Sequence, residues 1–234
     1  MSARRIFKDA RSAILESAGS ELAAPFIAAL PVDGASVSVL AGPVSGHTVS
    51  ASNAIATRLD ELQFDLGEGP CWDAMATRRP VLHADFRREQ TDEWPMFRRA
   101  VHEDPRGSGV QAVYAFPLFV GSLDIGAVDL YSTSRTPLQS HEVIDASELA
   151  SVAAWQVLRR ILSDTASDDA AGPSTYNRRE VHQATGMVLA QLDITAEEAA
   201  LLLRAHAFSS GRSVAEVAND IVERRLTFAD DGTP

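Results

Sequence analysis

The fold of the C-terminal part of the chain is decided by residues 176–226, which read YNRREVHQATGMVLAQLDITAEEAALLLRAHAFSSGRSVAEVANDIVERRL. Apolar residues recur here every three or four positions, the spacing that places side chains on one face of a helix. The clearest stripes are Val181, Ala184, Val188 and Leu192, and Val214, Val217, Ala218, Ile221 and Val222. Because the connections are short, the pattern predicts three roughly antiparallel helices packed as a bundle.

Capping residues mark where the second and third helices begin. Thr195 is followed three residues later by Glu198, and Ser213 by Glu216, so each pair can form a reciprocal capping box. Gly211 can adopt the left-handed conformation that ends a helix. The first helix is expected at about residues 177–192, the second from Thr195 and the third from Ser213.

Gly186 interrupts the first helix, because glycine in a helix interior costs roughly 1 kcal/mol relative to alanine. Two explanations stay open. Either another helix packs closely against Gly186 and Ala190, or a nucleotide or protein partner approaches the bare backbone. The outward face of this helix is expected to carry Arg178, Arg179, Gln183 and Thr185.

The C-terminal stretch resembles an ANTAR domain. The resemblance is carried, in order, by VHQATGMVL (181–189), EA (198–199), LRAHA (203–207), RSV (212–214) and VANDIV (217–222). It implies a three-helix module of bacterial regulators that binds paired short hairpins in nascent mRNA and prevents transcription termination. The family often has lysine at the position of Thr185, so this chain lacks one cation of the implied RNA-binding face.

Composition and charge limit the classes of protein to which the chain can belong. The 234 residues, 45% hydrophobic, suffice for one large or two ordinary domains. No signal peptide or membrane span is expected, and the single cysteine, Cys71, fits a reducing cytoplasm. The net charge is −11, but residues 176–226 hold 6 basic and 7 acidic side chains. Three carboxylates in the third helix disfavour DNA-groove binding relative to the reading of RNA loops.

The N-terminal part changes from helical to alternating patterns. Helices are expected at residues 4–30, 53–62 and 94–102, and strands at 35–40, 47–51, 80–83, 110–119 and 122–131. Turns are expected at residues 42–46 and 120–121, and a glycine-containing loop at residues 64–70. These elements predict an α+β domain with an antiparallel sheet and flanking helices, followed by the all-α three-helix bundle.

Residues 10–162 are similar to a GAF domain. The similarity rests on LGEGPCWDA (66–74), RPV (79–81), WP (94–95), VYAFPL (113–118), Gly121 and IGAVDLY (125–131). It implies a signal-transduction module that holds a small molecule over one sheet face or serves only for dimerisation. The resemblance identifies neither a ligand nor a cofactor, because a fold does not carry its function with it.

The candidate ligand pocket of this domain is aromatic, although core packing explains the same residues equally well. Its members are Phe64, Cys71, Trp72, Phe86 and Trp94. Cys71 is interpreted as a small buried hydrophobe rather than a redox sensor or chromophore anchor. The histidines do not cluster at metal-ligand spacing, so no metal site is expected. GAF-like reductases of free methionine sulfoxide use several cysteines, so neither catalytic residues nor enzyme activity is expected.

Residues 139–162 predict a long helix whose apolar stripe is wider than one sheet face requires. A homodimer would cover the surplus, and so would the N-terminal helix of the same chain. The small, acidic residues 163–175 predict a flexible linker. The expected organisation is therefore a sensory or dimerisation domain at 1–162, the linker, an RNA-binding domain at 176–226, and a disordered tail at 227–234.

These observations favour a cytoplasmic, dimeric antitermination regulator whose GAF-like domain controls RNA binding. The residues expected to contact RNA are Arg178, Gln183, Thr185, Gly186, Arg204 and Arg212. Two alternatives stay open: a signalling adaptor whose three helices bind a protein partner, and a DNA-binding repressor.

Overall fold

The computed structural model describes residues 3–17, 21–41, 45–89, 91–135, 137–166 and 173–228. The chain forms two compact units that divide near residue 170. No helix among these residues is both long and apolar enough to cross a membrane.

The first unit is built on a five-stranded sheet in the order β2-β1-β5-β4-β3. Pairing is antiparallel between β1 and β5, β5 and β4, and β4 and β3. The strands are β1 (Gly34–Ala41), β2 (Ser45–Ala51), β3 (Val81–His83), β4 (Ala112–Val120) and β5 (Leu123–Ser132). The predicted α+β class and its five strands are confirmed.

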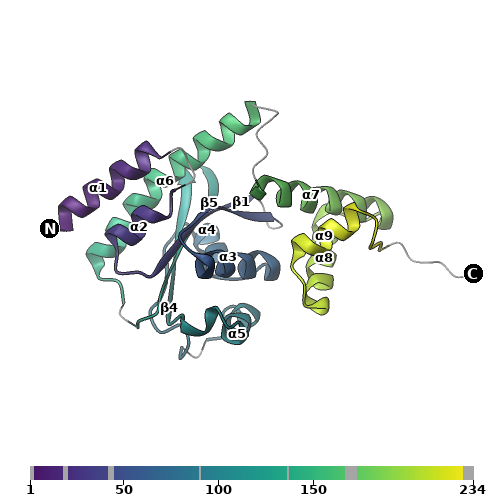
Figure 1. The fold of residues 1–234 in the computed structure, drawn as a ribbon, viewed down its shortest axis with the longest axis horizontal. Coiled ribbons are helices and arrows are strands. Elements are labelled where there is room, and N and C mark those ends of the chain that lie inside the picture. The colour runs from purple at the N-terminus through teal and green to yellow at the C-terminus, as the bar shows by residue number, and fades with distance from the viewer. Residues whose placement is uncertain are drawn as a thin grey trace, which may run out of the picture. The chain divides into compact units, whose positions relative to one another are not determined.

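Helices cover both faces of this sheet (Figure 1). On one face lie α1 (Ala3–Glu16), α2 (Ala24–Ala29) and the long α6 (Ser140–Ala166). On the other lie α3 (Ala54–Leu66) and α4 (Pro70–Thr77), with α5 (Pro95–Glu103) packed against α3 and a short 3-10 turn, η2, at Gly107–Gly109.

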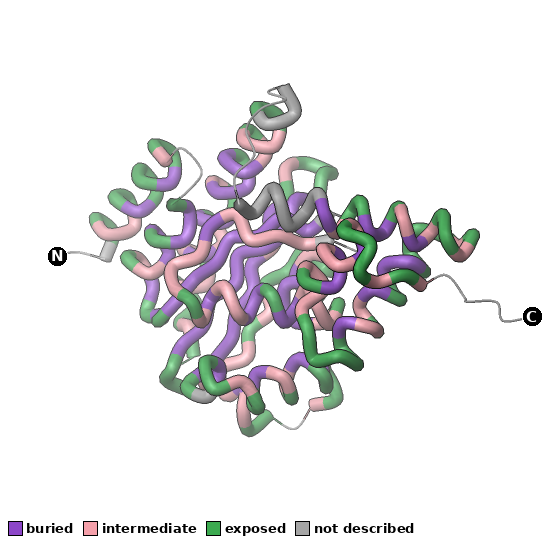
Figure 2. The backbone as a smooth tube through the Cα atoms, turned by 45° about the vertical axis from the view of Figure 1, so that its right-hand side comes forward, coloured by how far each residue is buried: buried purple, intermediate pink, exposed green. Residues whose placement is uncertain are grey.

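The two sheet faces differ in chemistry because side chains alternate along each strand. Val37, Tyr114 and Val128 belong to the apolar core beneath α1, α2 and α6. The alternate positions of β1 and β5 place Ser36 and Asp129 on the opposite face. Figure 2 shows the strands buried along much of their length, so these polar side chains lie inside the unit.

Two segments depart from the expected boundaries. The loop predicted at residues 64–70 is shorter, because α3 continues to Leu66 and α4 begins at Pro70. Gly67 ends α3 in the left-handed conformation (φ 67°), and the buried Gln63 side chain accepts a hydrogen bond from the Cys71 N–H. The helix predicted at residues 4–30 is two helices, the second with a proline in its first turn.

The second unit is the predicted three-helix bundle. Its helices are α7 (Pro173–Leu192), α8 (Ala196–Ser210) and α9 (Val214–Val222). Both capping boxes form: the Thr195 N–H donates to Glu198 at 2.8 Å and the Ser213 N–H donates to Glu216 at 2.8 Å. Gly211 ends α8 at φ 65°.

At the two ends of this unit, the observed boundaries differ from the predicted ones. The predicted linker is helical at both ends, since α6 extends to Ala166 and α7 begins at Pro173; residues 167–172 lie outside the described part. The predicted disordered tail starts too early. Thr227 and Phe228 both donate to the Gln191 side chain, and Phe228 packs against the bundle core. Residues 229–234 lie outside the described part.

Candidate functional site

The exposed face of α7 is polar and contains bare backbone. His182, Gln183, Gly186 and Ala190 are exposed there. A Cβ atom added to Gly186 would meet no atom within 4 Å outside its own helix and neighbours. Close helix packing within the described structure therefore does not explain this glycine, which leaves a surface open to a partner.

The expected outward orientation of Thr185 is wrong. Thr185 is only 8% exposed, and its hydroxyl donates to the Val181 carbonyl at 2.7 Å. Thr185 follows Val181 by four residues and precedes Val188 by three, so it lies on the face that packs into the bundle. It is not part of the exposed α7 surface.

The predicted arginines differ in how available their charges are. Arg204 on α8 is half-buried, and this burial lowers its pKa while nearby Glu197 opposes the shift. Arg212 is exposed, but it pairs with Asp220 at 2.6 Å and donates to the Glu216 carbonyl. The side chain of Arg178 lies outside the described part.

Two further cations follow α9 and were missing from the predicted interface. Arg225 pairs with Asp220 and with Glu223, so Asp220 is shared between Arg212 and Arg225. Arg224 is exposed and makes no ion pair among the residues that the structure describes. The sequence signal for these two cations was the adjacent pair Arg224 and Arg225, directly after the apolar positions of the third helix.

The outer surface of α8 carries three large exposed apolar side chains. Leu201 is 60% exposed and Phe208 is 62% exposed, and Leu202 is also exposed. Leu201 and Phe208 are seven residues apart, close to two helical turns, so they lie on one side of α8. This surface is a second candidate contact region of the bundle.

In the first unit, the polar sheet face holds a buried carboxyl group, Asp60 of α3. Its oxygens accept hydrogen bonds from Ser36 at 2.7 Å, Ser38 at 2.5 Å and Thr48 at 2.8 Å. Burial raises the pKa of Asp60 to about 6, against the opposing effect of the three hydroxyls. The group therefore titrates in the range of mildly acidic media.

A second buried carboxyl, Asp129 of β5, lies close enough to interact with Asp60 electrostatically. Asp129 is 8% exposed, and neither of its carboxyl oxygens has a hydrogen-bond partner. Burial, followed by the charge of Asp60, raises the pKa of Asp129 well above its usual value. The Gln63 amide favours the charged form, but its geometry does not complete a hydrogen bond.

Asp129 borders a small cavity of about 10 Å³. We call this the Asp129 cavity. Almost all of its surface is apolar. Its lining residues are Ser36, Ala56, Leu59, Gln63, Pro70, Phe97, Val113, Asp129, Leu130 and Tyr131. A volume of this size accommodates about one water-sized species.

The predicted aromatic pocket residues do not line this cavity. Phe64, Cys71 and Trp72 pack together beside β1 and β5, whereas Phe86 and Trp94 belong to a separate cluster with Phe97. Cys71 is fully buried, and burial together with the charges of Asp129 and Asp60 raises its thiol pKa well above the usual value. Its thiol form is favoured, which fits a packing role.

The sequence contained one signal for the buried pair of carboxyl groups, and the sequence analysis missed it. Asp129 is an acid within the strongly apolar strand at residues 125–131, at a position of the same parity as the buried Ala127 and Tyr131.

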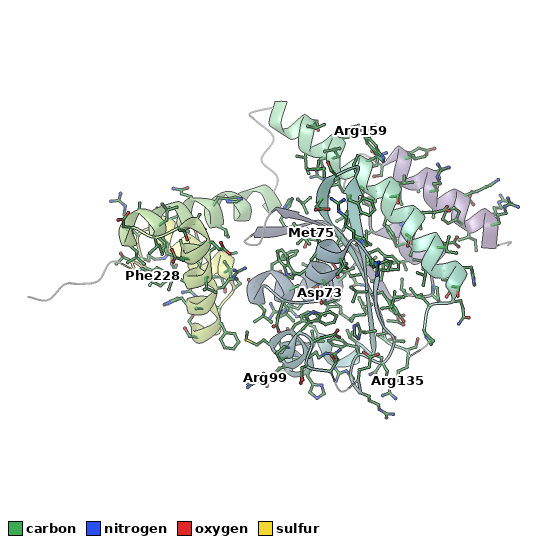
Figure 3. All side chains as sticks on the ribbon, turned by 180° about the vertical axis from the view of Figure 1, so that it is seen from behind. Asp73, Met75, Arg99, Arg135, Arg159 and Phe228 are labelled. Atoms are coloured by element: carbon green, nitrogen blue, oxygen red, sulfur yellow. The ribbon has the colours of Figure 1, made fainter. Side chains whose placement is uncertain are left out.

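The long helix α6 keeps an exposed apolar stripe although α1 covers part of it. The Gln156 side chain donates to the Leu15 carbonyl at 2.9 Å, and Ile14 is fully buried. The stripe that remains consists of Ile144 (58% exposed), Trp155 (63%) and Leu162 (61%). Spacings of eleven and seven residues place these side chains on nearly one line, on which the exposed Glu148 and Ser151 also lie, with the exposed Arg159 nearby on α6 (Figure 3).

Comparisons with known proteins agree with this architecture. A GAF domain model matches residues 1–159, and an ANTAR domain model matches residues 176–222. No curated protein matches the chain.

Solved structures are similar in fold to the first unit. The GAF domain of a phosphoenolpyruvate-protein phosphotransferase from Coxiella burnetii has a TM-score of 0.52 and 13% identity, covering 70% of this chain and 96% of that one. The corresponding Acinetobacter domain has a TM-score of 0.51 and 12% identity, covering 69% and 97%. A free methionine-R-sulfoxide reductase from Neisseria meningitidis, solved with its substrate, has a TM-score of 0.52 and 15% identity, covering 69% and 91%. Similarity at these identities concerns the fold alone.

Proposed function

Because the chain belongs to the GAF domain family and carries an ANTAR domain after its GAF domain, we propose that it is an RNA-binding transcription antitermination regulator. The ANTAR module binds paired hairpins in nascent mRNA in the cytoplasm, and the GAF domain controls this binding in response to a small molecule. The chain acts by binding and has no catalytic function of its own.

The observation that carries the RNA proposal is the exposed face of α7 within the ANTAR match. Gly186 leaves the helix backbone accessible, and Gln183 beside it offers both hydrogen-bond donors and acceptors. RNA loops present unstacked bases whose edges can be read by such groups. Arg178, Arg204 and Arg212 remain the proposed phosphate or base contacts, whereas Thr185 is removed from the interface because it is buried.

A homodimer explains why two hairpins are recognised together. The exposed stripe of Ile144, Trp155 and Leu162 is the proposed contact, since two copies of α6 would bury these side chains against each other. Each protomer then contributes one ANTAR module, and the two modules gain effective concentration on an RNA with two adjacent sites.

The apolar surface of α8 favours a second candidate function, that of a signalling adaptor. Leu201, Leu202 and Phe208 suit a protein partner better than a polyanion. In this alternative the pairing of Arg212 and Arg225 with Asp220 limits the charge available for nucleic acid.

The test is equilibrium binding of the full chain to an RNA with two adjacent short hairpins, at low and moderate salt. Single-hairpin RNA and duplex DNA are the competitors. We expect preference for the paired hairpins and a steep loss of affinity with salt, because phosphate contacts release counterions. Absence of any preference over duplex DNA, in folded and dimeric protein, would overturn the proposal.

A further inference from the structure

A surface cleft of about 280 Å³ lies on the first unit, between α5 and the loop that follows β3. Its basic lining residues are Arg87 of the loop and Arg98, Arg99 and His102 of α5. We call it the Arg87 cleft. Among the described residues, none lines both this cleft and the Asp129 cavity. The chain as a whole has a net charge of −11, so this grouping of basic side chains does not follow from composition.

The guanidinium group of Arg87 is held in place by backbone carbonyls. Its Nε donates to the Val110 carbonyl at 2.7 Å, and its Nη2 donates to the Gly107 carbonyl at 2.9 Å. Arginine has five N–H groups in a planar fork, so these two bonds and one to His102 leave two N–H groups for another acceptor. Because the side chain is already fixed, it loses little conformational entropy when a ligand binds.

Arg87 contacts a second base instead of an acid. Its Nη1 donates to Nδ1 of His102 at 3.1 Å. Since arginine only donates, His102 accepts at Nδ1, and its Nε2 carries the ring proton. Within the described part of the chain, neither Arg87 nor His102 forms an ion pair with a carboxylate. The charge of Arg87 therefore lacks a counterion, and a bound anion would supply one.

The two carboxylates that line the cleft have cationic partners of their own. Glu103 pairs with Arg99 at 2.8 Å, while Glu89 contacts His83 and lies 3.7 Å from Arg98. The lining contains three arginines and two glutamates, so one positive charge remains when histidine is counted as neutral. Exposed ion pairs such as the one between Arg99 and Glu103 are weak, so Arg99 is able to turn toward a bound anion.

These donors suit a phosphate group better than a carboxylate. A carboxylate uses its two oxygens on one arginine fork, whereas the donors here come from two elements, the loop with Arg87 and α5 with His102. A phosphomonoester has three strong acceptor oxygens and close to two negative charges near neutral pH. At about 30 Å³ for each water molecule, a cleft of about 280 Å³ is larger than a phosphate group needs, which leaves room for a small organic substituent.

We propose that the Arg87 cleft binds the phosphate group of a small phosphomonoester through N–H groups of Arg87 and of His102 Nε2. The inference deepens the proposed function, on which its signalling role rests, because it gives the small molecule sensed by the GAF domain a chemical class. Binding is non-covalent. Phe86, one of the residues expected in a ligand pocket, also lines this cleft.

The test is isothermal titration calorimetry of the full chain with glycerol 3-phosphate, glycerol and succinate, in a phosphate-free buffer of constant ionic strength near neutral pH. We expect glycerol 3-phosphate to bind once per chain with a dissociation constant of about 1 mM or tighter, and glycerol not to bind. Absence of saturable binding up to about 10 mM glycerol 3-phosphate would overturn the proposal. Succinate binding of equal affinity would also overturn it, because the cleft would then accept any small dianion.

Two matched substitutions locate the binding. His102→Glu places a carboxylate beside the Arg87 guanidinium, where it should replace the anion and weaken glycerol 3-phosphate binding by about tenfold or more. Its unfolding midpoint should stay within a few degrees of the parent's, since His102 is exposed. His141→Glu makes the same charge change at an exposed histidine of α6, on the other side of the sheet, and should leave the affinity within about twofold. Equal weakening by both substitutions, or none by His102→Glu, would contradict the assignment.

A third variant removes the charge of the arginine itself. Arg87→Gln keeps a donor for the backbone carbonyls and should weaken glycerol 3-phosphate binding as much as His102→Glu does. If Arg87→Gln does not fold, His102→Glu decides. Hairpin binding is measured without phosphomonoester, so a chain that binds paired hairpins but not glycerol 3-phosphate would refute this inference alone. A chain that binds glycerol 3-phosphate but no hairpins would refute only the RNA proposal.

Discussion

Ser36 and Asp129 face each other across β1 and β5, yet the Ser36 hydroxyl donates to Asp60 of α3 at 2.7 Å rather than to its cross-strand neighbour. This choice concentrates the available hydroxyl protons on one carboxyl and leaves the other unpartnered. Two buried acids on the same sheet face thus have different hydrogen-bonding environments.

The first prediction concerns stability and pH. The pKa of Asp60 is raised in the folded protein to about 6, from an ordinary value near 3.8, so the folded state binds the proton more tightly. Its contribution is fully present below about pH 4 and is lost as pH rises through about 6, by roughly 3 kcal/mol. Chemical denaturation between about pH 4 and 7 should show this slope in the first unit. Asp60→Asn should flatten it, and an unchanged slope in that variant would contradict the assignment.

Gly186→Ala should change stability and RNA affinity in opposite directions. The new Cβ meets no neighbour and replaces glycine in a helix, so the ANTAR module should gain up to about 1 kcal/mol. RNA affinity should fall if the bare backbone is approached by RNA. Gly211→Ala is the matched control: it should destabilise by about 1 kcal/mol, because Gly211 has φ 65°. Unfolding and hairpin binding of both variants provide the comparison.

Thr185→Val tests the corrected orientation of this residue. The Thr185 hydroxyl bonds within its own helix and is buried, so its removal should leave hairpin affinity within about twofold of the parent. A loss of about tenfold or more, in a variant with an unchanged unfolding midpoint, would place Thr185 at the RNA after all.

Trp155→Glu should separate the proposed dimer into monomers. The substitution places a charge in the middle of the exposed α6 stripe, where a second copy would have to bury it. Met96→Glu is the control, since Met96 is an exposed hydrophobe of α5, outside this stripe. Light scattering coupled to gel filtration measures both. A parent chain that is monomeric at micromolar concentration would remove the dimer from the proposal.

Elements governed by local chemistry were predictable. The capping boxes at Thr195 and Ser213 and the helix end at Gly211 depend on residues within one turn, and all three form as expected. The five strands also form close to the ranges expected for them. Boundaries were less accurate where a distant contact intervened, as where Gln191 holds the residues after α9 against the bundle.

By itself, the sequence determined the two-domain order, the α+β class of the first unit and the three capped helices of the second, because periodicity and capping act over a few residues. Only the tertiary structure decided that Thr185 points inward, that the aromatic candidates divide into two clusters, and that Ser36, Asp60 and Asp129 meet. Those outcomes depend on strand register and on helix packing between segments tens of residues apart. Burial there raises the free energy of a charged group, and a local sequence pattern does not show which groups become buried.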